Sequence, residues 1–222
     1  MVLLEIYRSI NSPMAAEGLS FAMGYFDGIH IGHRQVINSA LRYKGKMRTG
    51  VLTFSSHPLL DINGSAPPEI IENDEKIAII ESLGADCIYM LDFAEVKEYT
   101  AAEFIEILSD RMNVKAVSCG ANFSIGSDRV GIIELASICA KRNVELSVND
   151  IVKYKGIPVS STNIREAVRS GDMLLAGGML GRPFGFKSEI IMGDQRGRRL
   201  GFPTINQKFP TKNGKRLASD DL

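Results

Sequence analysis

Two histidines, His30 and His33, lie three residues apart in the stretch MGYFDGIHIGHRQVI, among Gly24, Gly28 and Gly32. An apolar run before the glycines predicts a strand and helical periodicity after them predicts a helix, so the glycines form the loop between. Free N–H groups and the helix dipole at such a helix N-terminus favour an anion, and glycine lets a phosphate approach the backbone closely. Imidazoles beside that anion can donate hydrogen bonds to phosphoryl oxygens as negative charge grows on them. The stretch therefore predicts a phosphate-binding site.

Two other interpretations of this stretch are open. The histidine pair could bind zinc with His57 of FSSHP, the third histidine of the chain, as a further protein ligand. The stretch could also be a tight turn that carries its histidines incidentally. Glycines around the imidazoles suit a phosphate better than a metal cage, so the phosphate site is the interpretation that we prefer.

A second polar stretch, VSSTNIREAV at residues 159–168, places hydroxyl side chains at the start of a predicted helix. Ser161 and Thr162 could donate hydrogen bonds to a phosphate, and Arg165 follows one turn later, where its guanidinium could reach the same anion. Plain capping of the helix by a hydroxyl explains the stretch equally well when it is taken alone. Its pairing with the glycine–histidine stretch favours a shared phosphate site.

Strand-length apolar runs alternate with helical patterns along most of the chain. The predicted strands cover residues 21–25, 49–54, 86–91, 114–119 and 144–148. The predicted helices cover residues 33–43, 73–83, 100–112, 131–142 and 160–170, and the proline- and glycine-containing stretch 57–70 predicts a loop. This alternation predicts an α/β fold with a doubly wound parallel sheet, in which ligands bind beyond the carboxyl ends of the strands.

The composition is that of an ordinary globular protein, with 45% hydrophobic and 23% charged residues among 222. The formal net charge is zero and the sequence pI is about 6.8, so the overall charge favours neither nucleic acid nor an anionic membrane. No apolar run of the sequence is long enough to span a bilayer, and the N-terminus lacks the basic region of a signal peptide. Three cysteines without a CxxC pattern argue against a disulfide framework. We therefore expect a cytoplasmic protein, while the oligomeric state stays open.

The pattern changes after Arg182 and Pro183. Residues 184–192 predict a strand, residues 193–201 predict a basic, turn-rich loop, and no helical pattern follows in the sequence. We therefore place a boundary between a domain at residues 1–183 and a short, incomplete β appendage at residues 184–222. A segment of about forty residues is marginal for an independent hydrophobic core.

The two polar stretches occur together with five others in a fixed order. Between residues 21 and 206 the chain contains GYFDGIHIGHRQVI, LTFSSHP, EKIAIIESLGAD, AAEFIEIL, CGANFSIG, VSSTNIREAVRSGDMLLAGGMLGRPF and GDQRGRRLGFPTIN. The GxFDGxHxGH and SSTxIR patterns resemble the nucleotidyltransferase superfamily of HxGH type. All seven stretches together resemble the bacterial bifunctional riboflavin kinase/FAD synthetase family in order and spacing.

The resemblance implies a Rossmann-like adenylyltransferase domain that joins the AMP of ATP to FMN and releases pyrophosphate. Its catalytic residues would be His30, His33 and Arg165. Its ATP-binding residues would be Gly24, Phe26, Asp27, Gly28, Ser161 and Thr162. Its flavin-binding residues would be Phe54, His57, Pro58, Asn122 and Phe123. The ATP would carry Mg²⁺, with no metal ligand from the protein in this site.

The resemblance also covers part of a second activity. In the family a riboflavin kinase domain, a small β-barrel, follows the LGRP motif. GFPTIN is similar to the PTAN motif of that domain, so Thr204 and Asn206 would match its Mg-ATP residues, with Ile205 in place of the usual alanine. The residues after Asn206 are polar and charged, a composition that does not favour strands. We expect Thr204 and Asn206 to be remnants, and the chain not to phosphorylate riboflavin.

Three positions depart from the pattern of the family: two bear on the flavin side, and the third, Pro158, removes a possible contact to phosphate. Ser56 stands where a proline is usual, Pro158 where many members carry a basic residue, and Ile125 where an aromatic residue is common. These departures bear on substrate affinity and on the flavin-binding residues, and they leave the HxGH pair intact.

Three alternative functions remain open. Adenylyl or cytidylyl transfer to a pantetheine phosphate or to nicotinamide mononucleotide agrees with the HxGH and SSTxIR motifs, although the LGRPF and GFPTIN stretches favour flavin. Full riboflavin kinase and FAD synthetase activity is a second alternative. A flavin- or nucleotide-binding sensor that has lost turnover is the third, and pyrophosphate release that depends on FMN would separate a transferase from it.

Overall fold

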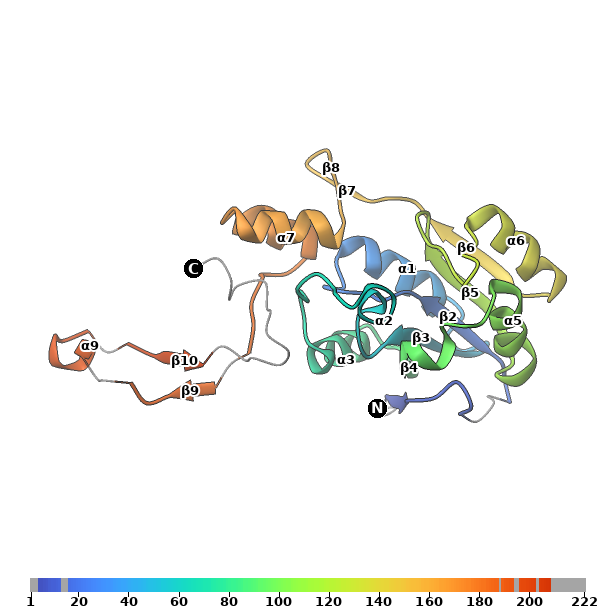
Figure 1. Cartoon of the computed structure of the whole chain (residues 1–222), viewed down its shortest axis with the longest axis horizontal. Helices are drawn as coiled ribbons and strands as arrows, with labels where there is room; N and C mark the ends of the chain where they lie inside the picture. The colour runs from blue at the N-terminus through green and yellow to red at the C-terminus, as the bar shows by residue number, and fades with distance from the viewer. Residues whose placement is uncertain (1–3, 13–15, 188, 194–195, 203, 209–222) are drawn as a thin grey trace.

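The computed structural model of the chain describes residues 4–12, 16–187, 189–193, 196–202 and 204–208. Most of them form an α/β unit around one six-stranded sheet, and a hairpin extends away from this unit (Figure 1). Among these residues no helix has the length and apolar character needed to cross a membrane.

The sheet is parallel throughout, and its strands follow the spatial order β1-β4-β3-β2-β5-β6. The strands are β1 (Glu5–Tyr7), β2 (Leu19–Met23), β3 (Arg48–Phe54), β4 (Cys87–Leu91), β5 (Val114–Gly120) and β6 (Glu145–Asn149). From β2 the chain proceeds outward through β3 and β4, and it then returns to add β5 and β6 on the opposite side of β2. The strand order thus reverses between β2 and β5, which confirms the predicted doubly wound sheet.

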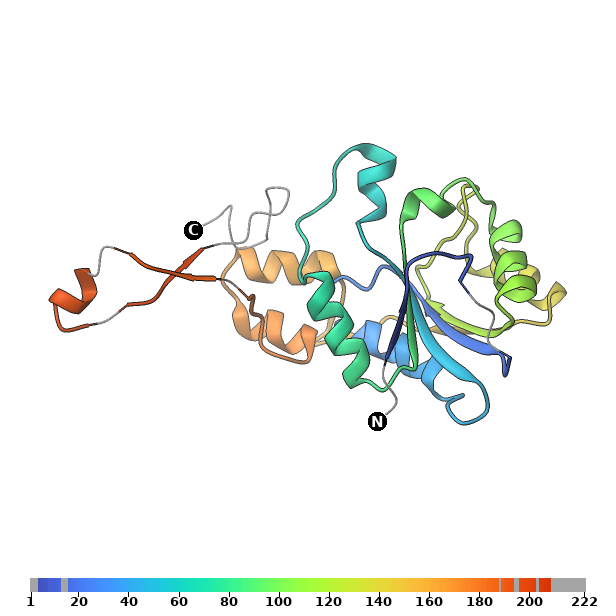
Figure 2. The ribbon, with the colours of Figure 1, turned by 90° about the horizontal axis from the view of Figure 1, so that it is seen from below.

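Helices cover both faces of the sheet (Figure 2). They are α1 (Ile31–Leu41), α2 (Pro58–Asn63), α3 (Asn73–Ser82), α4 (Phe93–Val96), α5 (Ala101–Glu106), α6 (Ile132–Lys141), α7 (Ser161–Arg169) and α8 (Met173–Leu180). α5 continues as a π-helix, Ile107–Arg111. Its N-terminus carries the predicted capping box, in which the Thr100 side chain accepts from the Glu103 N–H and the Glu103 carboxylate accepts from the Thr100 N–H.

Successive residues of each central strand enter two separate cores, because side chains alternate across a strand. Phe21 and Tyr89 pack with α5, the π-helix and α6 on one face. Ala22 and Ile88 pack with α1, α3 and α8 on the other face. The strands are therefore buried on both sides, as the continuous apolar runs of the sequence predict. The three cysteines are buried free thiols, which agrees with the predicted lack of a disulfide framework.

Several elements differ from the sequence predictions. The stretch 57–70, predicted as a loop, contains α2, and the predicted basic loop 193–201 contains the short helix α9 (Arg196–Arg199). In α2, Pro58 occupies the first turn and Gly64, with φ of 71°, ends the helix, so both residues bound a helix where we expected them to prevent one. β1, α4 and α8 have no counterpart among the predicted elements.

The C-terminal part of the described chain is a hairpin of β9 (Glu189–Ile191) and β10 (Asn206–Lys208), with α9 at its tip. It projects beyond α7 and α8, away from the sheet, in both views (Figures 1 and 2). A second small hairpin, β7 (Lys153–Tyr154) with β8 (Ile157–Pro158), precedes α7. The domain boundary between residues 183 and 184 stays a prediction, and the end of the proposed appendage, residues 209–222, lies outside the described residues.

Candidate functional site

A polar pocket lies where the strand order reverses. It has a volume of about 470 Å³, and three segments that follow the carboxyl ends of β2, β5 and β6 line it together with the start of α7. Its lining residues are Met23–Phe26, His30, Gly32, His33, Val36, Gly120–Phe123, Asn149–Val152 and Pro158–Ser161. The ends of parallel strands at a topological switch point are the expected place for a ligand in this architecture.

The loop from Phe26 to Ile29 carries strained backbone beside this pocket. Phe26 and Ile29 have φ values of 56° and 37°, and Gly28 has φ of 84°. Left-handed φ is costly for residues with a Cβ, most of all for a β-branched residue such as Ile29. Strain of this kind persists where the surrounding structure enforces it, and it is frequent at ligand sites.

Asp27 ties the strained loop to two distant segments. Its Oδ1 accepts a hydrogen bond of 2.9 Å from the Ile70 N–H, and its Oδ2 forms an ion pair with the Arg165 guanidinium. Burial raises the pKa of Asp27, while Arg165 and the Ile70 N–H oppose this rise. The Arg165 Nε also donates to the Pro68 carbonyl at 2.7 Å. Arg165 therefore supports the loop from behind, rather than lining the polar pocket.

His30 and His33 form a stacked pair at the start of α1. Their ring centroids lie 3.5 Å apart with planes inclined by 17°, and Nδ1 of His30 accepts from the His33 N–H at 3.1 Å. A Cβ on Gly32 would lie 3.3 Å from the His30 ring, so glycine at this position makes room for the imidazole. The helix N-cap is thus the His30 side chain itself.

Both imidazoles are held neutral. Burial lowers the pKa of His30 to about 4. Burial, together with the positive charges that His30 and Lys76 can carry, holds the pKa of His33 well below its usual range. Because Nδ1 of His30 accepts a hydrogen bond, its proton must be on Nε2. Among the described residues, His33 Nδ1 is the buried side-chain atom that has no hydrogen-bond partner. A buried polar atom of this kind needs a partner, which an ordered water or a ligand would supply.

Two of the three hydroxyl residues at the start of α7 reach the polar pocket. Ser160 caps α7, and Ser161 donates from Oγ to the Asp27 carbonyl at 3.0 Å. Both serines line the polar pocket, whereas Thr162, expected on sequence grounds to bind ATP, is exposed and outside its lining. On sequence grounds Ser160 received no role of its own, although this residue belongs to the same run of hydroxyl side chains.

Arg182, in the LGRPF stretch, completes the support of the loop, a role that the sequence analysis did not assign to it. Its Nη1 donates to the Gly28 carbonyl at 2.8 Å, and Nη2 lies 3.4 Å from a carboxylate oxygen of Glu75. Gly181, with φ of 69°, ends α8 immediately before it. The guanidinium therefore links the end of α8 to the strained loop and to α3.

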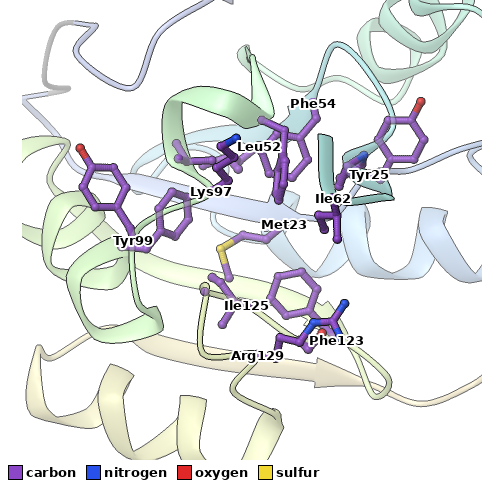
Figure 3. A pocket seen from close by; sticks show the side chains of 17 residues that line it. Met23, Tyr25, Leu52, Phe54, Ile62, Lys97, Tyr99, Phe123, Ile125 and Arg129 are labelled. Atoms are coloured by element: carbon purple, nitrogen blue, oxygen red, sulfur yellow. The ribbon is translucent and has the colours of Figure 1, made fainter. Parts of the chain in front are cut away.

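An apolar second pocket of about 300 Å³ adjoins the polar pocket, and we call it the aromatic pocket (Figure 3). Met23 lies in its centre, Leu52 and Phe54 border it on one side, and Phe123 and Ile125 border it on the other. The residues that line both pockets are Met23, Gly24, Tyr25 and Phe123. The two pockets therefore share one wall, made by the end of β2 and the loop after β5.

The five residues expected on the flavin side are divided by the structure. Phe54, Pro58 and Phe123 line the aromatic pocket, and Asn122 lines the polar pocket. His57 lines neither of these two pockets: its Nδ1 accepts from the Leu59 N–H and caps α2, and its ring lies 4.7 Å from that of Tyr25.

Two cationic side chains, Lys97 and Arg129, line the aromatic pocket and were not identified from the sequence. Among the residues that the structure describes, neither side chain has a hydrogen-bond or ion-pair partner. Arg129 has a left-handed φ of 54° in a tight turn that Asp128 fixes by accepting from the Ala101 N–H at 3.0 Å. A rigid turn thus presents an unpaired cation to an apolar pocket.

The described residues do not support the zinc interpretation. Among them, no group of three or more His, Cys, Asp or Glu side chains is placed to hold a metal ion. Nδ1 of His30 and Nδ1 of His57 both serve as helix caps. The donors of the polar pocket suit an anion better than a cation, so a metal ion there would have to arrive on phosphate oxygens.

Comparison with known proteins places this geometry in a family. A family model for FAD synthetase matches residues 12–163, and a model for riboflavin kinase matches residues 180–218. The bifunctional riboflavin kinase/FMN adenylyltransferase of Buchnera aphidicola subsp. Schizaphis graminum is 33% identical over 218 residues, which cover 93% of this chain and 68% of that protein. Proteins of the same name from Listeria monocytogenes and Bacillus subtilis are 32% and 33% identical over 83% of this chain. The chain spans 60% of the length of these two relatives.

Solved structures agree on the architecture. The crystal structure of a macrolide-efflux protein from Streptococcus pneumoniae has a TM-score of 0.80 and 26% identity, over 93% of this chain and 69% of that one. A pantoate-beta-alanine ligase from Francisella tularensis, in complex with beta-gamma ATP and beta-alanine, has a TM-score of 0.53 and 14% identity, over 77% of this chain and 78% of that one. The second similarity shows the fold alone.

Proposed function

The chain belongs to the FAD synthetase family, and on that premise we propose that it is an FMN adenylyltransferase. It would transfer the AMP unit of Mg-ATP to the phosphate of FMN, giving FAD and pyrophosphate. The cytoplasmic location expected from the sequence agrees with its three free cysteines.

The observation that carries this proposal is the pair of adjoining pockets. One is polar, with two imidazoles and a glycine-rich loop, and the other is aromatic and apolar. Donors beside a helix N-terminus suit a triphosphate, and an apolar slot between aromatic side chains suits a flat ring. The shared wall at Gly24 and Phe123 would let the phosphate of a ring-bound FMN enter the polar pocket.

The reaction that we propose is a direct displacement. A phosphate oxygen of FMN bonds to the α-phosphorus of ATP while the bond from that phosphorus to the bridging oxygen of pyrophosphate breaks. Such a transfer depends on positioning and on charge stabilisation, and it needs no enzyme nucleophile. Neutral imidazoles are suited to this role because they donate hydrogen bonds without transferring a proton in the step.

Four side chains of the polar pocket and one behind it receive roles in this proposal. His30 Nε2–H and the unpaired edge of His33 would donate to the phosphate oxygens on which charge develops. Ser160 and Ser161 would approach the triphosphate from α7. Arg165 would act as a positioning residue, because its guanidinium already contacts Asp27 and Pro68. Mg²⁺, bound to the phosphates, would neutralise part of their charge.

The match to the riboflavin kinase model gives a second candidate function, phosphorylation of riboflavin. Thr204 and Asn206, the motif residues in question, are exposed on the hairpin that carries β9 and β10. Our expectation from the sequence stays that they are remnants and that this chain does not phosphorylate riboflavin. FMN formed from riboflavin and Mg-ATP by the purified protein would contradict it.

A coupled assay of pyrophosphate release tests the proposed function. We expect release from Mg-ATP to depend on FMN, and not on a pantetheine phosphate or nicotinamide mononucleotide offered in its place. His33→Ala should lower turnover by about a hundredfold, as loss of one transition-state donor typically does. Gln35→Ala, on the exposed side of the same helix, is the matched control and should keep wild-type turnover. Tight binding of ATP and FMN without release would instead indicate a sensor.

A further inference from the structure

A buried lysine lies behind the wall that the two pockets share. Lys76, on α3, is 1% exposed, and its Nζ donates to the Tyr25 carbonyl at 3.0 Å. The same Nζ lies 4.1 Å from the centroid of the Tyr25 ring. Tyr25 lines both pockets, so this ammonium reaches the site through one residue of its shared wall.

Tyr25 is held from three sides. Its carbonyl also accepts from Thr53 Oγ1 at 2.9 Å, its hydroxyl donates to Glu69 Oε1 at 2.5 Å, and its ring packs against that of His57. In the described part of the chain, no carboxylate forms an ion pair with Lys76. A fully buried ammonium without a paired carboxylate is costly for folding, which indicates a role other than stability.

Resting on the proposed adenylyltransferase function, we propose that Lys76 is a positioning residue of the phosphate site. Its ammonium fixes the Tyr25 carbonyl, and with it the wall between the pockets, and it supplies a fixed positive charge behind the loop that receives the triphosphate. A charge in a water-excluded region acts strongly on charge that develops nearby, because little solvent screens it.

The surroundings of Lys76 make its protonation state observable. The charged and titratable groups that face it are Asp27, Glu69, Tyr25, His33 and His57. Burial lowers the pKa of Lys76 to about 8, while Asp27 and Glu69 oppose this fall. Burial also lowers the pKa of both histidines and raises that of Tyr25, so these three groups stay neutral between pH 7 and pH 9. Lys76 should therefore lose its proton near pH 8 in the free protein. The effect of its positive charge on catalysis should disappear over the same pH range.

The first test replaces the charge by a methionine of similar length. In Lys76→Met we expect kcat/KM for FAD formation to fall by about tenfold to a hundredfold at pH 7, and the Kd for Mg-ATP in calorimetry to rise. The alkaline fall of kcat/KM near pH 8 should disappear in this variant, because kcat/KM reports groups of the free enzyme. Thermal unfolding should show Tm unchanged or higher, since a buried charge is replaced by an apolar side chain.

Two further variants separate charge from structure. Lys44→Met is the matched control, because Lys44 Nζ also donates to a backbone carbonyl, that of Gly84 at 2.5 Å, but on the surface. Its kcat/KM and ATP affinity should stay at the wild-type level. Lys76→Gln keeps an amide donor near Tyr25 without the charge, and it should lose activity as Lys76→Met does.

Wild-type kcat/KM and ATP affinity in Lys76→Met, or a full recovery in Lys76→Gln, would overturn the inference. So would an alkaline limb near pH 8 that persists in Lys76→Met. Absence of FAD formation by the wild-type protein would instead contradict the proposed function, and the calorimetric comparison of ATP binding would still test Lys76.

Discussion

Replacing Arg165 by methionine should expose how strongly the strained loop depends on a buried ion pair. The side chains of Arg165 and Asp27 are 7% and 4% exposed, so the substitution leaves a carboxylate buried without its cation. Removing one partner of such a pair typically costs about 3–5 kcal/mol of stability. The hydrogen bond to the Pro68 carbonyl is lost as well, at a cost of about 1 kcal/mol.

Protonation of Asp27 sets an upper limit to the cost of the unpaired charge, because the buried carboxylate can take up a proton and become neutral. For an unfolded-state pKa of about 3.9, protonation at pH 7 costs about 4 kcal/mol, and at pH 5 only about 1.5 kcal/mol. Burial already raises the pKa of Asp27 in the wild-type protein, and in the variant this pKa is raised further, because Arg165 no longer opposes the rise. The contribution of Asp27 to stability is therefore present at low pH and is lost as pH rises through that raised pKa.

Urea unfolding at pH 7 and pH 5 measures this effect directly. We expect the free energy of unfolding of Arg165→Met to be about 4–5 kcal/mol below that of wild type at pH 7. At pH 5 this difference should be smaller by about 2.5 kcal/mol. The double variant Asp27→Asn, Arg165→Met retains an acceptor for the Ile70 N–H and should recover to within about 1 kcal/mol of wild type. A loss below 1 kcal/mol, or one that does not change with pH, would refute the reasoning.

Three glycine-related substitutions extend the predictions. Gly32→Ala places a Cβ 3.3 Å from the His30 ring, so kcat/KM should fall while stability stays within about 1 kcal/mol of wild type; unchanged kcat/KM would refute this. Glycine adopts the φ of 54° at position 129 without strain, so Arg129→Gly should raise the free energy of unfolding by about 1 kcal/mol. Calorimetry should show several-fold weaker FMN binding in this variant, and equal affinity would refute a role for this cation. Gly50→Ala places a Cβ 2.6 Å from the Cys87 sulfur, and its Tm should fall, corresponding to about 1–3 kcal/mol; an unchanged Tm would contradict the packing.

The strands and the long helices of the sheet unit follow from sequence patterns. β2, β3, β4 and β5 are buried apolar runs, and the capping box at Thr100 places the start of α5. The sequence did not predict α2 and α8, for physical reasons. An imidazole, that of His57, caps α2, and this residue is an unusual cap. α8 is apolar almost throughout and contains two glycines, so no polar face marks it as a helix.

Sequence patterns likewise predict only part of the candidate site. His30, His33 and Ser161 belong to the two motifs that the sequence analysis singled out, and the structure places all three in the lining of one pocket. Lys76 and Arg182 lie in stretches that carry the family resemblance, EKIAIIESLGAD and LGRPF, but no role was assigned to either residue, because both reach the loop only through the packing of α3 and α8. Contacts of this kind depend on which helices lie side by side, and a single sequence does not encode that in a local pattern.

The most direct test of the central proposal is chromatographic analysis of the flavins formed from FMN and Mg-ATP, with a parallel reaction that contains riboflavin in place of FMN. The proposed function predicts FAD in the first reaction, in amounts equal to the pyrophosphate released. The separate expectation that Thr204 and Asn206 are remnants predicts neither FMN nor FAD in the second. No FAD from FMN, in protein that binds ATP and is folded, would contradict the proposed function.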